Sequence, residues 1–230
     1  MPNKRKKFEY TKKKSEDFFE GTKIQSLSLY NKGRELQKEK KYKEAIELYD
    51  QALNLNPNDI YIWINKAESL MMLGRNKESI KVIDDAIRCF PDNPLLYYNK
   101  GRLYKQLDNL ESALQQIGIA LKLNPLDASI WLEKGKILLE KGKIGEAIKC
   151  FNKSIKLKPN PEALLAKGTS LLKNKNNEKA INCFDRILEI SPDNADAWYN
   201  KGIALGNIGK KKEGLKCIKK STKLRKNPNQ

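Results

Sequence analysis

The chain has 230 residues, of which 46 are Lys or Arg, 28 are Asp or Glu and none is His, so its formal net charge is +18. Without histidine, the chain has no Ser-His-Asp or Cys-His nucleophile and no histidine metal site. Its 39% apolar and 32% charged residues indicate a protein that is neither embedded in a membrane nor wholly disordered.

The first 25 residues are basic. They carry eight basic and four acidic side chains, with most of the cations in residues 1–14, so we expect residues 1–25 to form a partly disordered N-terminal arm. Charge rather than an apolar run follows the first residues, which argues against a secretory signal, and no window is apolar enough for membrane insertion. Four cysteines without a CxxC pair indicate reduced thiols, and therefore a cytoplasmic protein.

From about residue 26 the chain repeats itself, and the period is visible in three residue types. Proline recurs at steps of 34 or 33 residues, at Pro57, Pro91, Pro125, Pro159 and Pro192. Small residues recur with the same period at Gly33, Ala67, Gly101, Gly135, Gly168 and Gly202. A second small series follows twelve residues later, at Ala45, Ser79, Ala113, Ala147, Ala180 and Gly214.

Each repeat predicts two helices. In residues 128–160 the apolar positions have helical spacing on both sides of a turn at Lys141-Gly142-Lys143. The later repeats open with residues that cap helices, namely Asp59, Asn93, Asp127, Asn160 and Asn194, and the recurring prolines should end each second helix. Glycine inside a helix costs about 1 kcal/mol relative to alanine. We therefore expect the small residues of facing helices to let the two backbones approach closely, with a large aromatic residue beside them.

One repeat carries a recognisable motif. The pattern Trp131-x-x-Lys134-Gly135-x-x-Leu138, followed by Ala147, Phe151 and Pro159, resembles the tetratricopeptide repeat. The resemblance covers six repeats, at 26–59, 60–93, 94–127, 128–160, 161–194 and 195–227, and leaves residues 228–230 as a C-terminal tail. It implies an all-α protein, a right-handed α-solenoid of six helix-turn-helix repeats, whose first helices make the concave wall. The sequence departs from the pattern where Ala67 replaces Gly and where Ser79 and Gly214 replace Ala.

Little in the sequence indicates catalysis. Cys150, Cys183 and Cys217 occupy the same place in successive second helices. Packed helices lie about 8–10 Å apart, too far for a disulfide between equivalent positions, so we interpret these cysteines as small packing residues rather than metal ligands. No GxGxxG or GxxxxGK[ST] motif is present. We therefore expect no enzyme activity, no catalytic residue, no metal and no cofactor.

The first helices carry the candidate binding residues. Four residues before its recurring small residue, each one has a large side chain, at Leu29, Trp63, Tyr97, Trp131, Leu164 and Trp198. The residue after this large side chain and the residue four positions later share a face of the helix, and asparagine recurs between them. These positions predict a groove for a partner at Tyr30, Asn31, Arg34, Ile64, Asn65, Tyr98, Asn99, Arg102, Leu132, Lys136, Tyr199 and Asn200. The alternative is that the asparagines only bond neighbouring repeats and the tyrosines only pack. Family members that clamp a chaperone's terminal carboxylate need Lys and Asn at set positions, of which only Asn65 fits, so we expect no such clamp.

Excess positive charge is concentrated in three segments. Besides the N-terminal arm, residues 128–160 carry eight basic and three acidic side chains, and residues 195–230 carry ten and two. The last helix also places Thr222 where earlier repeats have an apolar residue, as expected for a polar terminal repeat. We expect a non-catalytic scaffold or adaptor that binds a protein or peptide ligand in the groove. The alternatives are an RNA- or ribosome-associated factor that acts through the basic ends, which would at least bind nucleic acid nonspecifically, and an assembly factor for a larger complex.

Overall fold

The computed structural model describes the backbone of residues 3–226 and the side chains of residues 20–226. The described residues form twelve helices and no strand, which confirms the predicted all-α solenoid of six helix pairs. The helices are α1 (Asn3–Lys38), α2 (Tyr42–Leu55), α3 (Ile60–Met72), α4 (Asn76–Cys89), α5 (Pro94–Gln106), α6 (Leu110–Leu123), α7 (Ala128–Glu140), α8 (Ile144–Leu157), α9 (Pro161–Lys173), α10 (Asn177–Ile190), α11 (Ala195–Asn207) and α12 (Lys211–Lys226).

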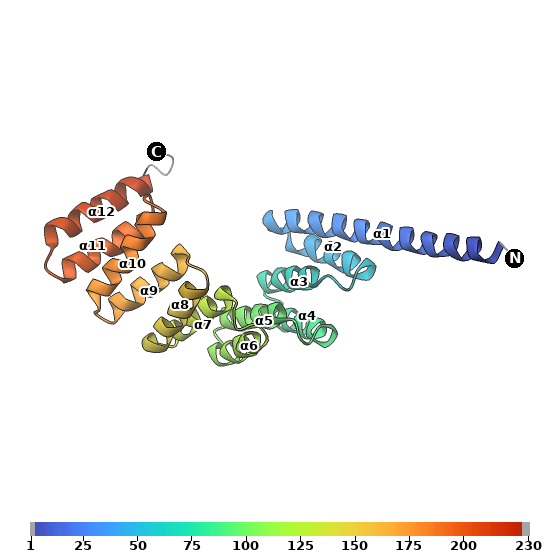
Figure 1. Ribbon diagram of the computed structural model, residues 1–230, viewed down its shortest axis with the longest axis horizontal. Coiled ribbons are helices and arrows are strands. Elements are labelled where there is room, and N and C mark those ends of the chain that lie inside the picture. The colour runs from blue at the N-terminus through green and yellow to red at the C-terminus, as the bar shows by residue number, and fades with distance from the viewer. Residues whose placement is uncertain (1–2, 227–230) are drawn as a thin grey trace. The chain divides into compact units, whose positions relative to one another are not determined.

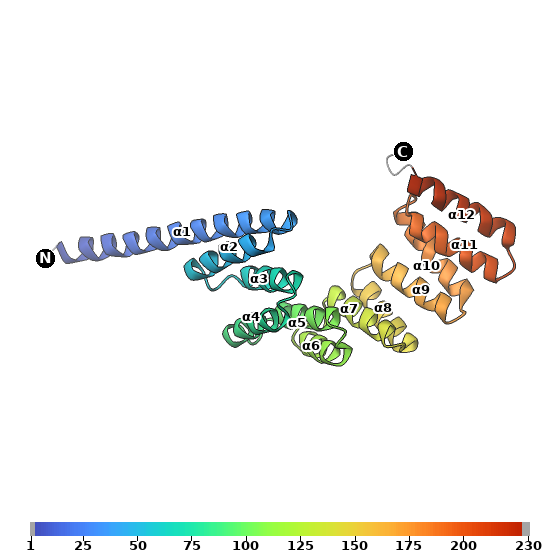
Figure 2. The ribbon, with the colours of Figure 1, turned by 180° about the vertical axis from the view of Figure 1, so that it is seen from behind.

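The chain divides into two compact units, which are considered separately. Unit 1 extends to Leu103 and contains α1 to α4 and most of α5, whereas unit 2 begins at Tyr104 and contains α6 to α12. Within unit 1, α1 packs on α2, α2 on α3 and α3 on α4, and within unit 2 each helix from α6 to α11 packs on the next. Figures 1 and 2 show this stacking in chain order within each unit.

Two sequence-based expectations concern the ends of the chain, namely a partly disordered N-terminal arm and a short C-terminal tail. α1 begins at Asn3 and so includes most of the N-terminal arm, whose partial disorder stays a prediction. The expected tail, residues 228–230, lies outside the described residues. At the other end, Thr222 is exposed and its hydroxyl donates to the Ile218 carbonyl of its own helix.

The helix ends lie where the capping and proline signals predicted them. The side-chain oxygens of the five cap residues accept backbone N–H bonds from the first turn of the following helix, in the pairs Asp59–Tyr61, Asn93–Leu95, Asp127–Ser129, Asn160–Ala163 and Asn194–Ala197. Each of the five recurring prolines comes two residues after the end of a second helix. These local interactions set the lengths of the helices.

Every turn inside a helix pair uses one residue with a left-handed backbone. Three of these residues are glycines with φ between 74° and 84°, Gly74, Gly142 and Gly209, and three are Lys40, Asp108 and Lys175 with φ between 57° and 62°. A left-handed residue other than glycine costs on the order of 1–2 kcal/mol, so the geometry of the turn, rather than the residue, is what the repeats share.

The helical glycines allow close packing, but mostly of a ring rather than of a backbone. A Cβ on Gly33 would lie 2.6 Å from the Tyr49 ring, and one on Gly168 would lie 2.5 Å from the Phe184 ring. At the last pair two backbones meet, because a Cβ on Gly214 would lie 2.6 Å from the Gly202 carbonyl oxygen. The expectation of backbone approach is therefore correct for α11 and α12. In the pairs that contain Gly33 and Gly168, the aromatic residue of the second helix fills the space over the glycine.

Two of the departures from the repeat pattern have a packing reason. Ser79 is fully buried, and its hydroxyl donates to the Ala67 carbonyl at 2.7 Å, which ties α4 to α3. In the last pair, Gly214 in place of alanine permits the contact with Gly202.

Three tryptophans fasten the loops that join one pair to the next. The indole N–H of Trp63 donates to the Pro57 carbonyl at 2.9 Å, and Trp131 and Trp198 make the same bond to Pro125 and Pro192 at 2.8 and 2.7 Å. The proline that ends a second helix is thus held by the first helix that follows.

Candidate functional site

The predicted groove residues belong to both units of the chain. Those from Tyr30 to Arg102 lie on α1, α3 and α5 within unit 1 and are called the unit 1 face, and those from Leu132 to Asn200 lie on α7 and α11 within unit 2. In both units they come from first helices, as the repeat pattern predicts. The side chains around them differ, so each surface is described by itself.

Tyr30 is the centre of the first part of the unit 1 face. Its hydroxyl accepts a hydrogen bond from Asn65 Nδ2 at 3.0 Å, which joins α1 to α3, and the Arg34 guanidinium lies 5.7 Å from its ring centroid. On its inner side the ring lies 6.1 Å from the Tyr49 ring. Burial raises the pKa of Tyr30, although Arg34 lowers it. The ring is therefore held on one side, and its hydroxyl stays protonated at neutral pH.

Tyr98 carries the same arrangement on α5. The Arg102 guanidinium lies 5.9 Å from the Tyr98 ring centroid and 3.4 Å from a Glu68 carboxylate oxygen on α3. Asn99 is buried, and its Oδ1 accepts from Arg102 at 3.4 Å. The unit 1 face thus presents two tyrosine rings, each next to a guanidinium and each connected to α3. Aromatic rings and arginine are the residue types enriched at binding hot spots.

The sequence offers two interpretations of the asparagines, as groups that bind a ligand or as bonds to neighbouring repeats, and individual asparagines differ in the contacts that they make. Asn65, Asn99 and Asn200 each donate to the carbonyl four residues earlier in their own helix, at 2.8 Å. Asn65 alone among them also bonds a neighbouring repeat, through Tyr30, and Asn31 is exposed. The asparagines therefore orient side chains of the helices as well as offering amide groups to a ligand.

The corresponding surface of unit 2 carries aliphatic side chains and ion pairs. Leu132 is buried, with 7% of its surface exposed, and Lys136 lies 2.6 Å from Glu162 on α9. Beside them, Glu133 is buried against Lys105, 3.1 Å away. Burial alone would lower the pKa of Lys105, but Glu133 and Glu140 raise it above its ordinary value. Sequence reasoning missed the Lys105–Glu133 pair because it joins residues of different repeats.

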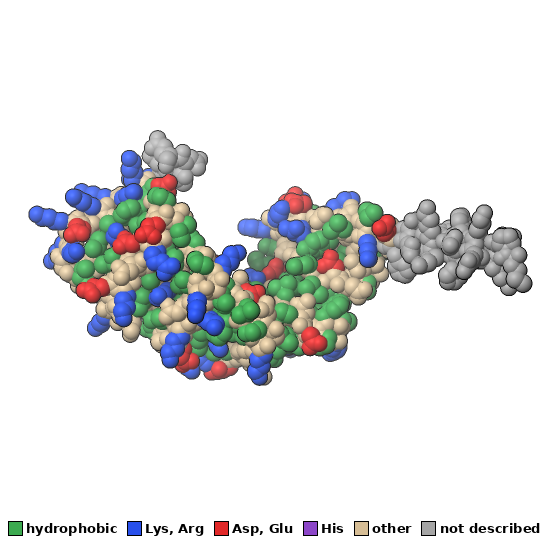
Figure 3. Space-filling model, in the orientation of Figure 1, with side chains coloured by type: hydrophobic (Ala, Val, Ile, Leu, Met, Phe, Trp, Pro, Cys, Tyr) green, Lys and Arg blue, Asp and Glu red, His purple; other side chains and the backbone are tan. Residues whose placement is uncertain are grey.

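Tyr199 is the exception within unit 2. It is 40% exposed, and the Arg225 guanidinium of α12 lies 5.3 Å from its ring centroid while bonding Asp196 at 2.7 Å. The cation here comes from the second helix of the pair, and nothing in the first-helix pattern indicated it. Figure 3 shows Lys and Arg side chains gathered over this end of unit 2, at the left of the view.

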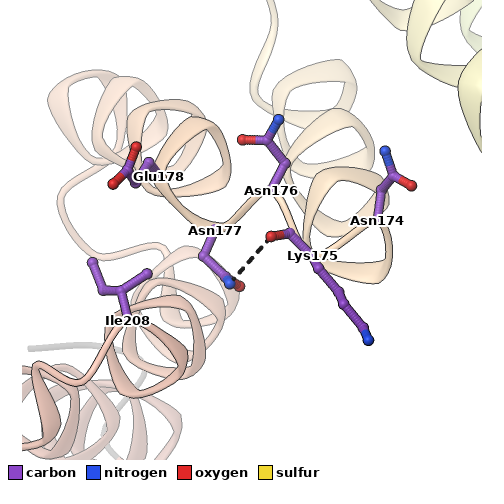
Figure 4. Close-up of a pocket in the computed structure, with 6 residues that line it drawn as sticks. All are labelled: Asn174, Lys175, Asn176, Asn177, Glu178 and Ile208. Atoms are coloured by element: carbon purple, nitrogen blue, oxygen red, sulfur yellow. Dashed lines mark hydrogen bonds between the residues drawn. The ribbon is translucent and has the colours of Figure 1, made fainter.

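A polar hollow of about 330 Å³ lies at the turn between α9 and α10. Figure 4 shows its lining residues, with the Lys175 side chain extending away from the others. The Asn177 amide donates to the Lys175 carbonyl and accepts from Asn207 Nδ2. The Asn177 amide is therefore already engaged in holding the turn.

The cysteines and carboxylates form no reactive cluster in the described part of the chain. Cys150, Cys183 and Cys217 are free and buried, whereas Cys89 is free and exposed. Burial raises the pKa of each of the three buried thiols, which makes them poor nucleophiles. Among the described residues no group of His, Cys, Asp or Glu is placed to hold a metal ion, and no helix combines the length and apolarity needed to cross a membrane.

Comparison with known proteins identifies the repeats. Two models described as "Tetratricopeptide repeat" match residues 36–103 and 98–161, one described as "TPR repeat" matches 168–209, and a third "Tetratricopeptide repeat" model matches 195–228. In sequence, Tetratricopeptide repeat protein 33 of Mus musculus is 38% identical over 61 residues, which is 26% of this chain and 23% of that protein. The chain thus matches about a quarter of that relative's length.

Two solved structures show the fold. The pilF protein of Pseudomonas aeruginosa aligns with a TM-score of 0.73 at 17% identity, covering 91% of this chain and 95% of that one. YrrB, described as "a TPR protein with an unusual peptide-binding site", aligns with a TM-score of 0.61 at 20% identity, covering 79% and 93%. Tetratricopeptide repeats are generally protein–protein interaction scaffolds and typically have no catalytic activity. With its six helix pairs and with repeat models matching along residues 36–228, the chain belongs to the tetratricopeptide repeat family.

Proposed function

We propose that the protein is a scaffold or adaptor whose unit 1 face binds a peptide or a helix of a partner protein. The observation that supports this most directly is the pair of ring–guanidinium groups, Tyr30–Arg34 and Tyr98–Arg102. The hydrogen bond from Asn65 to Tyr30 and the ion pair of Arg102 with Glu68 hold members of both groups before any ligand arrives. Such preorganisation reduces the side-chain entropy lost on binding.

The chemistry of the face suits an extended or helical peptide with apolar side chains and at least one carboxylate. A ring can cover an apolar side chain, and Arg34, which is exposed, can form a bidentate bond with a carboxylate. YrrB, whose fold is similar, has a peptide-binding site, which supports a peptide as the class of ligand. We extend the proposal to Tyr199 as a separate contact on unit 2.

Selection from a random peptide library tests this proposal with the full chain. We expect selected peptides to lose affinity when Tyr30 and Tyr98 are both replaced by Ala, because truncating an aromatic anchor commonly costs about 2 kcal/mol, or roughly thirtyfold in affinity. The control is Tyr42→Ala on α2, a second helix of the same unit. Unchanged affinity in the double variant, with helicity intact, would remove the unit 1 face from the mechanism.

Nucleic acid is the competing ligand class, favoured by the cations gathered on α12. Two of them are already engaged, since Lys220 lies 4.2 Å from the Trp198 ring centroid and Arg225 pairs with Asp196. Nonspecific contacts with single-stranded RNA weaken with a log–log salt slope of about −0.7 per phosphate. We expect RNA binding to collapse towards physiological salt and to be insensitive to Tyr98→Ala. A salt-resistant, sequence-preferring RNA complex that needs Tyr98 would favour the RNA function instead.

A further inference from the structure

An ion pair between a partly buried lysine and a more exposed aspartate recurs where one repeat packs on the next. A lysine of the first helix bonds an aspartate of the preceding second helix in Lys66–Asp50, Lys100–Asp84 and Lys201–Asp185, at 2.5, 2.6 and 2.5 Å. The aspartate neutralises each lysine, so three of the junctions between repeats carry no net charge from this position. The two partners come from helices that are adjacent in the stack, α2 and α3, α4 and α5, and α10 and α11.

The lysines of α7 and α9 lack this partner. Where the other repeats have aspartate, the chain has Gly118 before Lys134 and Asn152 before Lys167. Lys134 lies 5.5 Å from the centroid of the Trp131 ring. Lys167, by contrast, forms no ion pair with any described residue. The replacement of aspartate by Asn152 therefore leaves a positive charge without a counter-charge at this junction.

A pocket lies at that junction. It has a volume of about 300 Å³ and lies within unit 2, between α8, α9 and α10. Its polar lining consists of Asn152, Lys167, Lys179, Asn182, Cys183 and Arg186, with no carboxylate among the lining residues. Neither Lys179 nor Arg186 has an ion pair to a described residue. Three cations and two side-chain amides thus line one hollow.

Cysteines at equivalent positions of three successive repeats allow the electrostatic surroundings of these repeats to be compared. Burial is the main cause that raises the pKa of each thiol, but the charges around them differ. Glu146 acts on Cys150, and Asp185 and Glu213 act on Cys217, besides nearby lysines. The charged groups that act on Cys183 are Lys167 and Arg186, both cations. At Cys183 the named charged neighbours are thus both cations, unlike those at Cys150 and Cys217.

We propose that this pocket binds a phosphate group. A phosphate carries about −1.5 to −2 charges at pH 7 and three acceptor oxygens, which matches three cations better than the single charge of a carboxylate does. Arg186 can offer two parallel N–H donors, the lysines offer ammonium groups, and the amides of Asn152 and Asn182 complete the set of donors. Leu165 of α9 is the repeat equivalent of the predicted groove residue Leu132 of α7, and Lys167, two residues later, lies about 200° around the helix. The phosphate pocket is thus on a different face of α9 from the predicted groove position and does not depend on the peptide-binding function.

Calorimetric titration of the full chain with inorganic phosphate, and separately with O-phosphoserine, tests the proposal at constant ionic strength. We expect saturable binding with a Kd of about 1 mM or tighter. Tighter binding of phosphoserine would assign the pocket to phosphorylated side chains, and equal affinities would assign it to the free ion. No saturable binding of either compound would overturn the proposal.

The decisive variant is Asn152→Asp, which restores the aspartate of the other repeats. It should neutralise Lys167 while preserving the fold, and raise the Kd for phosphate at least about tenfold. Asn58→Asp, an exposed position in unit 1, makes the same chemical change and should alter the Kd less than about twofold. Equal effects of the two variants would mean that only net charge matters, and would contradict a defined site.

Alkylation of Cys183 gives an independent measurement. Phosphate in the pocket should slow the reaction of Cys183 with iodoacetamide, whereas the exposed Cys89 should react at an unchanged rate, as followed by mass spectrometry of peptides. In Asn152→Asp this protection should disappear. Protection of Cys89 and Cys183 to the same extent would indicate a general salt effect and count against the pocket.

Discussion

The two units use the same repeat positions for different chemistry. In unit 1 the groove-facing positions hold tyrosine rings beside arginines, and the ring over Gly33 is that of Tyr49, whose hydroxyl donates to Gln37 at 2.7 Å. In unit 2 most of these positions are aliphatic or paired in ion pairs, and the ring over Gly168 is that of Phe184. The fold thus places a ring over a small residue in both units but leaves the chemistry of the exposed face free.

The largest expected effect comes from blocking a ring–glycine contact in unit 2. Gly168→Leu places a side chain where the fully buried Phe184 ring already lies, and overpacking of this kind costs about 3 kcal/mol. Hydrogen exchange should show lost protection in α9 and α10 while α2 and α3 of unit 1 keep theirs. Gly145→Ala, at a position with nothing within 4 Å of the new Cβ, is the matched control and should be neutral or slightly stabilising. Uniform loss of protection in both units would contradict this picture.

A smaller effect should follow from breaking the Lys105–Glu133 ion pair of unit 2, in which the carboxylate itself is buried. Glu133→Gln leaves Lys105, whose side chain is 22% exposed, without its nearer partner, at a cost of about 2 kcal/mol. Because the pKa of Lys105 is raised above 10.5, this stabilisation is complete below pH 10.5 and is lost as the pH rises further. Chemical denaturation measures both effects. Glu162→Gln removes an exposed partner of Lys136 and should cost less than about 1 kcal/mol of stability. An equal loss of stability in Glu133→Gln and Glu162→Gln would contradict the argument that burial makes the Glu133 pair the stronger one.

The smallest effect concerns the ring that distinguishes unit 1. Tyr49→Phe copies the residue of unit 2 and removes the hydrogen bond to Gln37, which should cost about 1 kcal/mol at pH 7. Burial raises the pKa of Tyr49 well above its ordinary value of 10.0, so the folded protein keeps a proton that the unfolded chain loses above pH 10. The free energy of unfolding should therefore fall more steeply above pH 10 in the natural protein than in the variant. Parallel curves would show that the hydroxyl is not buried.

The fold was predictable from local sequence signals, whereas the contacts between helices were not predictable. Caps such as Asp59 and Asn160 act on backbone groups two or three residues away, so the sequence alone locates them. The Tyr30–Asn65 bond and the stacking of Arg225 on Tyr199 join residues 35 and 26 positions apart and depend on how successive helices pack. The Lys–Asp junction pairs are different, because they follow the repeat period at Asp50, Asp84 and Asp185. Their absence at Asn152 was open to sequence reasoning but was missed.

The three tryptophans whose indole N–H groups donate to proline carbonyls can serve as intrinsic fluorescence probes. Trp63 lies in unit 1 and Trp131 and Trp198 in unit 2, each fastened to the loop that precedes its helix. Lys220 lies close over the Trp198 ring, and Lys134 lies over Trp131, so their fluorescence emission should differ from that of Trp63 in wavelength and quenching. Chains that keep one tryptophan, with phenylalanine at the other two positions, would then report the loosening of a chosen junction during unfolding or ligand binding without any attached dye.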